Sequence, residues 1–153
     1  MKVGTDGVLL GAWASTERCQ RILDVGTGTG LIALMLAQRS TAILDAIDID
    51  SDACLQAQEN IAKSPFANRI QVYQTSLSEY MPDENIKYDL IVSNPPYFHH
   101  GQSFASPSRQ QARHTSSLSH QDLLEHSIRL LAPNGKIAFI LPVNEAHLMI
   151  EQA

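Results

Sequence analysis

Short apolar runs alternate along the chain with longer segments in which apolar residues recur at helical spacing. The runs at 21–25, 42–47, 70–74, 88–93 and 136–142 predict strands, and the third shows the period-two alternation of a half-buried strand. The segments 6–15, 31–37, 51–62 and 119–131 predict helices, with Asp6, Ser51 and Ser119 as their capping residues. The polar, acidic stretch 76–87 predicts a loop or helix fragment, and residues 133–135 predict a turn.

This order of elements predicts an α/β fold, a doubly wound, mostly parallel sheet with helices on both faces, as in Rossmann-like proteins. In such sheets, ligands bind at the carboxyl ends of the strands. Polar or glycine-rich residues occupy several of these ends, namely the turn 26–30, Asp48, Thr75-Ser76 and Asn94. We therefore expect one ligand site built from these strand ends.

Composition narrows the class of protein. With 153 residues, 44% of them hydrophobic and 18% charged, the chain suits one domain over residues 1–153. No apolar stretch is long enough to cross a membrane and no signal peptide is visible, so we expect a cytoplasmic protein. Cys19 and Cys54 lack metal or redox spacing, which favours buried, reduced thiols. A net charge of −5 argues against RNA binding by overall charge alone.

A glycine-rich turn follows the first predicted strand, in the order Asp24-Val25-Gly26-Thr27-Gly28-Thr29-Gly30. Such glycines allow a tight strand-to-helix turn and close approach of a ligand to the backbone, which indicates a nucleotide-like cofactor. Asp48 follows about 20 residues later, where a carboxylate can accept both ribose hydroxyls of an adenosine.

The glycine spacing separates two kinds of cofactor. A dinucleotide fingerprint would carry a third glycine at position 31, which is Leu31 here, and no hydride-transfer arrangement is visible, so NAD is disfavoured. The G-x-G-x-G form resembles that of the class I methyltransferases, which implies S-adenosylmethionine. Asp24 would then suit its ammonium group, directly or through water. Methyltransferases of this kind often bind the adenine amino group with an acid after the third strand, where this chain has Ser76.

The tetrapeptide Asn94-Pro95-Pro96-Tyr97 follows the fourth predicted strand. It suits methyl transfer to a planar amino group, whose lone pair is delocalised and weakly nucleophilic. The Asn94 side-chain carbonyl and the Pro95 backbone carbonyl can accept the two N–H bonds, and the prolines stiffen the turn that carries them. Tyr97 offers an aromatic face on which a flipped base can stack.

The sequence resembles the bacterial tRNA1(Val) adenine-37 N6-methyltransferases over essentially its whole length. The resemblance is carried by the run Lys2-Val3-Gly4-Thr5-Asp6-Gly7-Val8-Leu9-Leu10-Gly11, by Asn94-Pro95-Pro96-Tyr97-Phe98, and by Ala112-Arg113-His114 before a leucine-rich helix. It implies methylation of an adenine N6 in tRNA, and it implies that the segment around Thr5 and Asp6 closes over the cofactor. The family's longer sequences also imply that this chain lacks N- and C-terminal parts, including the last strands of a seven-stranded sheet, either as a fragment or as a naturally short gene product.

The candidate residues follow from these patterns and from the resemblance. The expected catalytic residues are Asn94, Pro95, Pro96 and Tyr97. The expected cofactor contacts are Thr5, Asp6, Asp24, Gly26, Thr27, Gly28, Gly30, Asp48, Ile49, Ser76 and Asn94. Between Asp89 and Asp122 there is no carboxylate, so we expect this segment to bind RNA phosphates and to order on binding. The expected RNA contacts are Phe98, Arg109 and Arg113, and no metal site is expected.

Other functions fit part of the same pattern. A glutamine N5-methyltransferase acting on release factors would use the same chemistry, although the flanking Lys2-to-Gly7 run and Arg109 and Arg113 favour RNA. A non-catalytic module that binds S-adenosylmethionine or RNA also remains open. We expect the protein to be a monomer.

Overall fold

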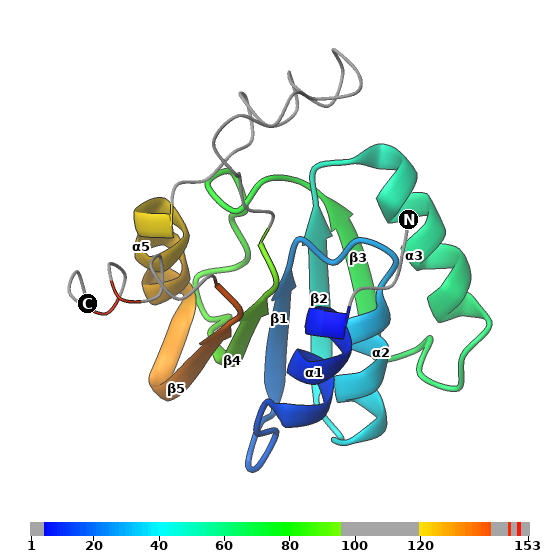
Figure 1. Cartoon of the computed structure of the whole chain (residues 1–153), viewed down its shortest axis with the longest axis horizontal. Coiled ribbons are helices and arrows are strands. Elements are labelled where there is room, and N and C mark those ends of the chain that lie inside the picture. The colour runs from blue at the N-terminus through cyan, green and yellow to red at the C-terminus, as the bar shows by residue number, and fades with distance from the viewer. Residues whose placement is uncertain (1–4, 96–119, 142–146, 148–149, 151–153) are drawn as a thin grey trace.

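Five parallel strands form one sheet in the computed structural model, which describes residues 5–95, 120–141, 147 and 150 (Figure 1). The strands are β1 (Arg21–Val25), β2 (Ile43–Asp48), β3 (Ile70–Gln74), β4 (Tyr88–Ser93) and β5 (Leu131–Phe139). Their order across the sheet is β3-β2-β1-β4-β5, with every neighbouring pair parallel. The predicted α/β fold with a parallel sheet is confirmed.

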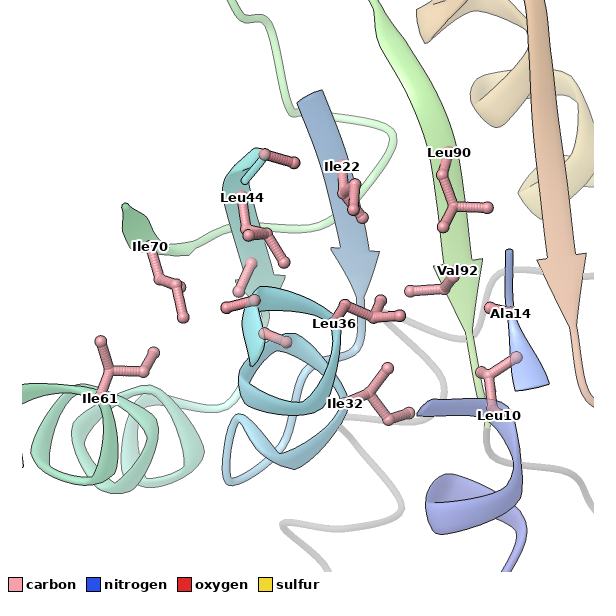
Figure 2. Packing of buried hydrophobic residues seen from close by; sticks show 14 of the residues in the cluster. Leu10, Ala14, Ile22, Ile32, Leu36, Leu44, Ile61, Ile70, Leu90 and Val92 are labelled. Carbon is pink, nitrogen blue, oxygen red and sulfur yellow. The ribbon is translucent and has the colours of Figure 1, made fainter. Parts of the chain in front are cut away.

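Helices lie on both faces of this sheet. On one face are α1 (Thr5–Trp13), α2 (Leu31–Gln38) and α3 (Ser51–Ala62), and α5 (His120–Leu130) packs on the other. Successive strand side chains alternate between the faces, so the central strands are apolar on both sides. The core under α1, α2 and α3 is shown in Figure 2 and includes Leu10, Ile22, Ile32, Leu36, Leu44, Ile61, Ile70, Leu90 and Val92. No helix in the described part of the chain is long and apolar enough to span a bilayer.

The opposite core contains a buried polar cluster around Asp45, which is only 4% exposed. Asp45 Oδ2 accepts hydrogen bonds from the Tyr88 hydroxyl at 2.6 Å and from Arg21 Nη1 at 3.1 Å. The Tyr88 and Tyr80 hydroxyls lie 2.7 Å apart. Burial raises the pKa of Tyr80 to about 12 and that of Tyr88 further, so both phenols stay neutral and can donate to the carboxylate.

Most predicted elements agree with the structure to within a residue or two, and three local predictions are wrong. Asp6 lies inside the first turn of α1 and is not its cap. The cap of α3 is Asp50, whose side chain accepts from the Asp52 amide, and Ser51 is already helical. β5 begins at Leu131, so the expected turn at 133–135 is an irregularity within the strand, where the pairing register with β4 shifts.

The helices α1 and α2 lie close together at Gly11, because a glycine has no side chain to keep them apart. A Cβ atom at Gly11 would lie 2.6 Å from the sulfur and 3.0 Å from the Cβ of Met35. Arg39 Nη1 also donates to the Gly11 carbonyl at 2.7 Å. These contacts hold α1 against α2.

We predict opposite effects for alanine at two glycines of α1. Gly11→Ala overpacks the contact with Met35 and should lower the free energy of unfolding by about 1–3 kcal/mol. Gly7→Ala is the matched control: its Cβ would meet no atom closer than 3.7 Å, so it should stabilise the helix by about 0.5–1 kcal/mol. Urea unfolding of both variants measures the difference, and equal effects would contradict the close contact.

Candidate functional site

The turn after β1 contains three glycines with left-handed backbone. The angle φ is 72° at Gly26, 58° at Gly28 and 87° at Gly30, values that strongly favour glycine. A Cβ atom at Gly26 would meet nothing within 4 Å, so this residue borders open space. A Cβ atom at Gly30 would lie 3.4 Å from the Cβ of Ala57. The turn thus packs on α3 at its end and leaves backbone accessible at its start.

Acceptors from the end of β2 hold this turn. Two amides of the turn donate to the Ile47 carbonyl, at 2.8 and 3.0 Å. Asp48 Oδ2 accepts from the Gly28 amide at 2.8 Å, and its Oδ1 accepts from the Asp50 amide at 3.0 Å. A single half-buried carboxylate therefore orders both the glycine turn and the start of α3.

Asp24 lies beneath the turn and is 0% exposed. Its Oδ2 accepts from the Thr27 hydroxyl at 2.8 Å, and its Oδ1 has no hydrogen-bond partner among the described residues. Burial, opposed by the Thr27 hydrogen bond and reinforced by the Asp48 carboxylate, raises the pKa of Asp24 to about 7. The expected contact of Asp24 with a ligand's ammonium group, directly or through water, stays a prediction.

β4 ends beside β1, so the residues after the two strands are neighbours. Ser93 pairs with Val25, and its hydroxyl donates to the Val25 carbonyl at 2.9 Å within the core. Asn94 and Pro95 follow and are half-buried. A Cβ atom at Gly7 would lie 3.7 Å from Asn94 Nδ2, so the first turn of α1 lies next to the asparagine. Asn94 therefore stands between the glycine turn and α1.

The end of β3 closes the site next to β2. The Thr75 amide donates to the Asp48 carbonyl at 2.9 Å. The Ser76 hydroxyl accepts from the Glu79 amide at 3.2 Å and lies 3.1 Å from the Ser78 hydroxyl. Ser76 thus organises a local turn, and its expected contact with an adenine amino group stays a prediction.

The structure brings most candidate residues to the carboxyl edge of the sheet. There it places Asp24, Gly26, Thr27, Gly28, Gly30, Asp48, Ile49, Ser76, Asn94 and Pro95, while Thr5 and Asp6 lie in the first turn of α1. The candidates Pro96, Tyr97, Phe98, Arg109 and Arg113 lie outside the described residues. In the part of the chain that the structure describes, no group of three His, Cys, Asp or Glu side chains could hold a metal ion.

Two side chains near the site were missed in the sequence. Asn60 in α3 donates from Nδ2 to the Thr29 carbonyl at 2.9 Å, and the only signal for this contact is its place one turn after the small, buried Ala57. The other is Ser93, a polar residue that ends an otherwise apolar central strand. Its position directly before Asn94 could have identified it.

A cavity of about 580 Å³ lies near the amino ends of β1 and β4, away from the glycine turn. Its lining residues are Ser15, Glu17, Arg18, Cys19, Asp89, Pro133, Asn134 and Lys136. None of them is a candidate site residue. The cavity is therefore separate from the ligand site predicted at the opposite edge.

Comparison with known proteins gives a consistent result. The model of the family described as methyltransferase small domain matches residues 4–153. The chain is 78% identical over its full length to the tRNA1(Val) (adenine(37)-N6)-methyltransferase of Parabacteroides distasonis, covering 65% of that protein. It is 54% identical over 93% of its length to the enzyme of the same name from Aeromonas salmonicida, covering 60% of it. The chain thus spans less than two thirds of these curated relatives.

Solved structures support the fold. A SAM-dependent O-methyltransferase from Thermotoga maritima superposes with a TM-score of 0.70 at 15% identity, covering 99% of this chain and 49% of that one. A putative methyltransferase from Thermoplasma acidophilum gives a TM-score of 0.64 at 12% identity, covering 86% of this chain and 48% of that one. At these identities the likeness concerns the arrangement of strands and helices. It bears out a class I methyltransferase fold.

We predict that Asp24 makes the folding stability fall as the pH rises. The carboxyl ionises near pH 4 when unfolded and near pH 7 when folded, so the unfolded state loses its proton first. The resulting penalty is absent below the unfolded pKa and complete above the folded one. Asp24→Asn removes this penalty. Between about pH 4 and pH 8, the free energy of unfolding of the variant should therefore rise relative to that of the wild type by a few kcal/mol. Urea unfolding of both proteins across this range tests it, and parallel pH curves would contradict it.

Proposed function

The chain belongs to the methyltransferase small domain family, and we propose that it transfers a methyl group from S-adenosylmethionine to the exocyclic N6 of an adenine in tRNA. The proposed position is adenine 37, beside the anticodon of tRNA1(Val), following the names of the relatives. The observation that carries the reaction type is the pairing of β1 with β4, which sets Asn94 beside the glycine turn. We expect the protein to act in the cytoplasm as a monomer.

The residues at the carboxyl edge fit this cofactor. Gly26 borders open space at the turn, where the methionine part would lie against the backbone. Asp24 Oδ1 is a buried acceptor without a partner among the described residues, which suits a water-mediated link to an ammonium group. Each Asp48 oxygen accepts one amide and keeps acceptor capacity for a ribose hydroxyl. Ile49, 36% exposed, would pack on the adenine ring, and Ser76 would bind its amino group.

The main task of the protein in this reaction is to position the two reactants. The bound cofactor supplies an electrophilic methyl group on a positively charged sulfur. Asn94 Oδ1 and the Pro95 carbonyl would each accept one N–H bond of the adenine amino group, which favours the pyramidal nitrogen that can attack. The C–N bond would form as the C–S bond breaks, and the adenine nitrogen would then lose a proton to solvent. Alignment of the two reactants supplies much of the rate without a strong general base.

The surroundings of Asn94 suit its proposed role as an acceptor for the adenine amino group. A Cβ atom at Gly7 would lie 3.7 Å from Asn94 Nδ2, so the first turn of α1 lies beside the Asn94 amide. Ser93 fixes the backbone just before it through the Val25 carbonyl. A fixed backbone and a neighbouring helix both favour a preorganised Asn94 carbonyl.

The substrate can be tested directly with the chain as it is. Labelled S-adenosylmethionine is incubated with the protein, undermodified tRNA and a protein extract, and the labelled fraction is identified. Label recovered as N6-methyladenosine in RNA is the expected result. Label in protein would instead favour the glutamine N5-methyltransferase. Label in neither fraction, from a protein that still binds S-adenosylmethionine, would contradict catalysis by this chain.

Asn94→Ala should abolish most of the turnover and change the affinity for S-adenosylmethionine little, because Asn94 is one of many expected cofactor contacts. Removing a preorganised acceptor typically costs about 10²–10³ in rate, whereas the glycine turn and Asp48 remain intact. The rate comes from single-turnover transfer to tRNA, and affinity for S-adenosylmethionine comes from calorimetry. Asn68→Ala, at an exposed asparagine just before β3 and near the opposite edge of the sheet, is the matched control and should change neither quantity. Full activity of Asn94→Ala would overturn the assigned role.

Arg109 and Arg113 are proposed to bind tRNA phosphates, on the basis of their acid-free sequence context. Replacing both with alanine should weaken tRNA binding and reduce the slope of log affinity against log salt by about 2, one for each lost phosphate contact. S-adenosylmethionine affinity should not change. A double Arg18→Ala, Lys87→Ala variant removes the same charge near the opposite edge of the sheet. Equal losses in the two double variants would argue for general electrostatics and against a specific contact.

A further inference from the structure

The glycine turn is held from a second direction, by a side chain of α3. Asn60 Nδ2 donates to the Thr29 carbonyl at 2.9 Å. The other end of the same amide, Oδ1, accepts from Gln56 Nε2 at 3.1 Å, one helical turn earlier. The two contacts agree on the orientation of the Asn60 amide, because a carbonyl acceptor requires the NH2 group to face Thr29.

We propose that Asn60 is a positioning residue that fixes the glycine turn for the cofactor, an inference that rests on the proposed function. Thr29 stands between Gly28 and Gly30, both of which have left-handed backbone and can readily change conformation. Asp48 holds the amide of Gly28 on one side of this stretch, and Asn60 holds the carbonyl of Thr29 on the other. Together they fix the Gly28–Thr29 segment from both sides.

The helix supports the same arrangement by packing. A Cβ atom at Gly30 would lie 3.4 Å from the Ala57 Cβ. Ala57 and Asn60 therefore lie against consecutive residues of the turn, Gly30 and Thr29. Packing alone restricts how far the turn can move but does not set the direction of a peptide group. The hydrogen bond from Asn60 sets that direction, and with it the backbone groups that a ligand would meet.

Loss of Asn60 should therefore weaken cofactor binding and leave the fold in place. Thr29 is only half-buried, so water can replace the amide in the folded protein. The turn then samples other conformations, and binding must select the competent one. The loss of one neutral hydrogen bond corresponds to about a fivefold weaker affinity.

Calorimetry with S-adenosylmethionine and with S-adenosylhomocysteine tests the proposal on the 153-residue chain. Asn60→Ala should bind both compounds about fivefold more weakly than the wild type. Asn60→Asp keeps the shape but turns an acceptor toward the Thr29 carbonyl, so it should bind at least as weakly. Gln58→Ala, at an exposed site of the same helix, is the control and should match the wild type. In single-turnover assays, the rate at saturating cofactor should stay within about twofold of the wild type in every variant.

A purely structural role predicts a different result. It would lower the unfolding midpoint and the fraction of competent protein, while the folded molecules bound the cofactor with wild-type affinity. Equal dissociation constants for Asn60→Ala and the wild type would overturn the proposal. If the wild type binds neither compound, the proposed function itself fails, which is a separate outcome.

A measurement on the wild type covers the case in which the Asn60 variants do not fold. The side-chain amide resonances of Asn60 should shift when S-adenosylmethionine saturates the protein, and those of the exposed Asn68 should not. Unshifted Asn60 resonances at saturation would also overturn the proposal.

Discussion

The parallel pairing of β1 with both β2 and β4 is the constraint on which the rest of the structure depends. Val25, the last residue of β1, pairs with Ile47 on one side and with Ser93 on the other. The strands β1, β2 and β4 therefore end side by side. The glycine turn follows β1, Asp48 ends β2, and Asn94 follows β4. A slip of β4 by one residue would move Asn94 by about 3.3 Å along the strand and turn its core side chains to the wrong face. Packing of both faces thus fixes the geometry of the site.

Two buried carboxylates in this sheet differ in how completely they are paired. Asp45 is paired with Arg21 and with the Tyr88 hydroxyl, so its charge is neutralised within the core. Asp24 accepts a hydrogen bond from the Thr27 hydroxyl, and its Oδ1 lacks a partner among the described residues. A buried carboxylate with one partner is costly, which is why its pKa is raised to about 7. The incomplete pairing of Asp24 supports a role in binding a cation, because an ammonium group linked through water would supply the missing interaction.

The parts of the fold that could be predicted are those set by local pattern. Buried strands such as Tyr88–Ser93 stand out as apolar runs, and their carboxyl ends fall together once the strands are taken as parallel. Helix caps could not be resolved, because Asp50 and Ser51 are both good capping residues and only the backbone decides between them. The early start of β5 depends on its pairing with β4 across the irregularity at 133–135. Asn60 was missed because its partner Thr29 is distant in sequence, and exposed helical asparagines are common.

The contacts that stiffen the glycine turn have a consequence for binding. Glycines with left-handed backbone give a turn that reaches close to a ligand, but such residues also lose the most conformational freedom when they become ordered. Ile47, Asp48 and Asn60 each bond to the turn, and Ala57 packs on its end, while Gly26 still borders open space. The order of the turn therefore comes from the protein before a cofactor arrives, and less of the binding free energy is lost in arranging it. Asn94 follows a different strand, β4, and its position depends on Ser93 and on the neighbouring first turn of α1. Under the proposed function, cofactor binding and amine positioning would thus depend on separate sets of contacts on one sheet edge, so a substitution in one set need not disturb the other.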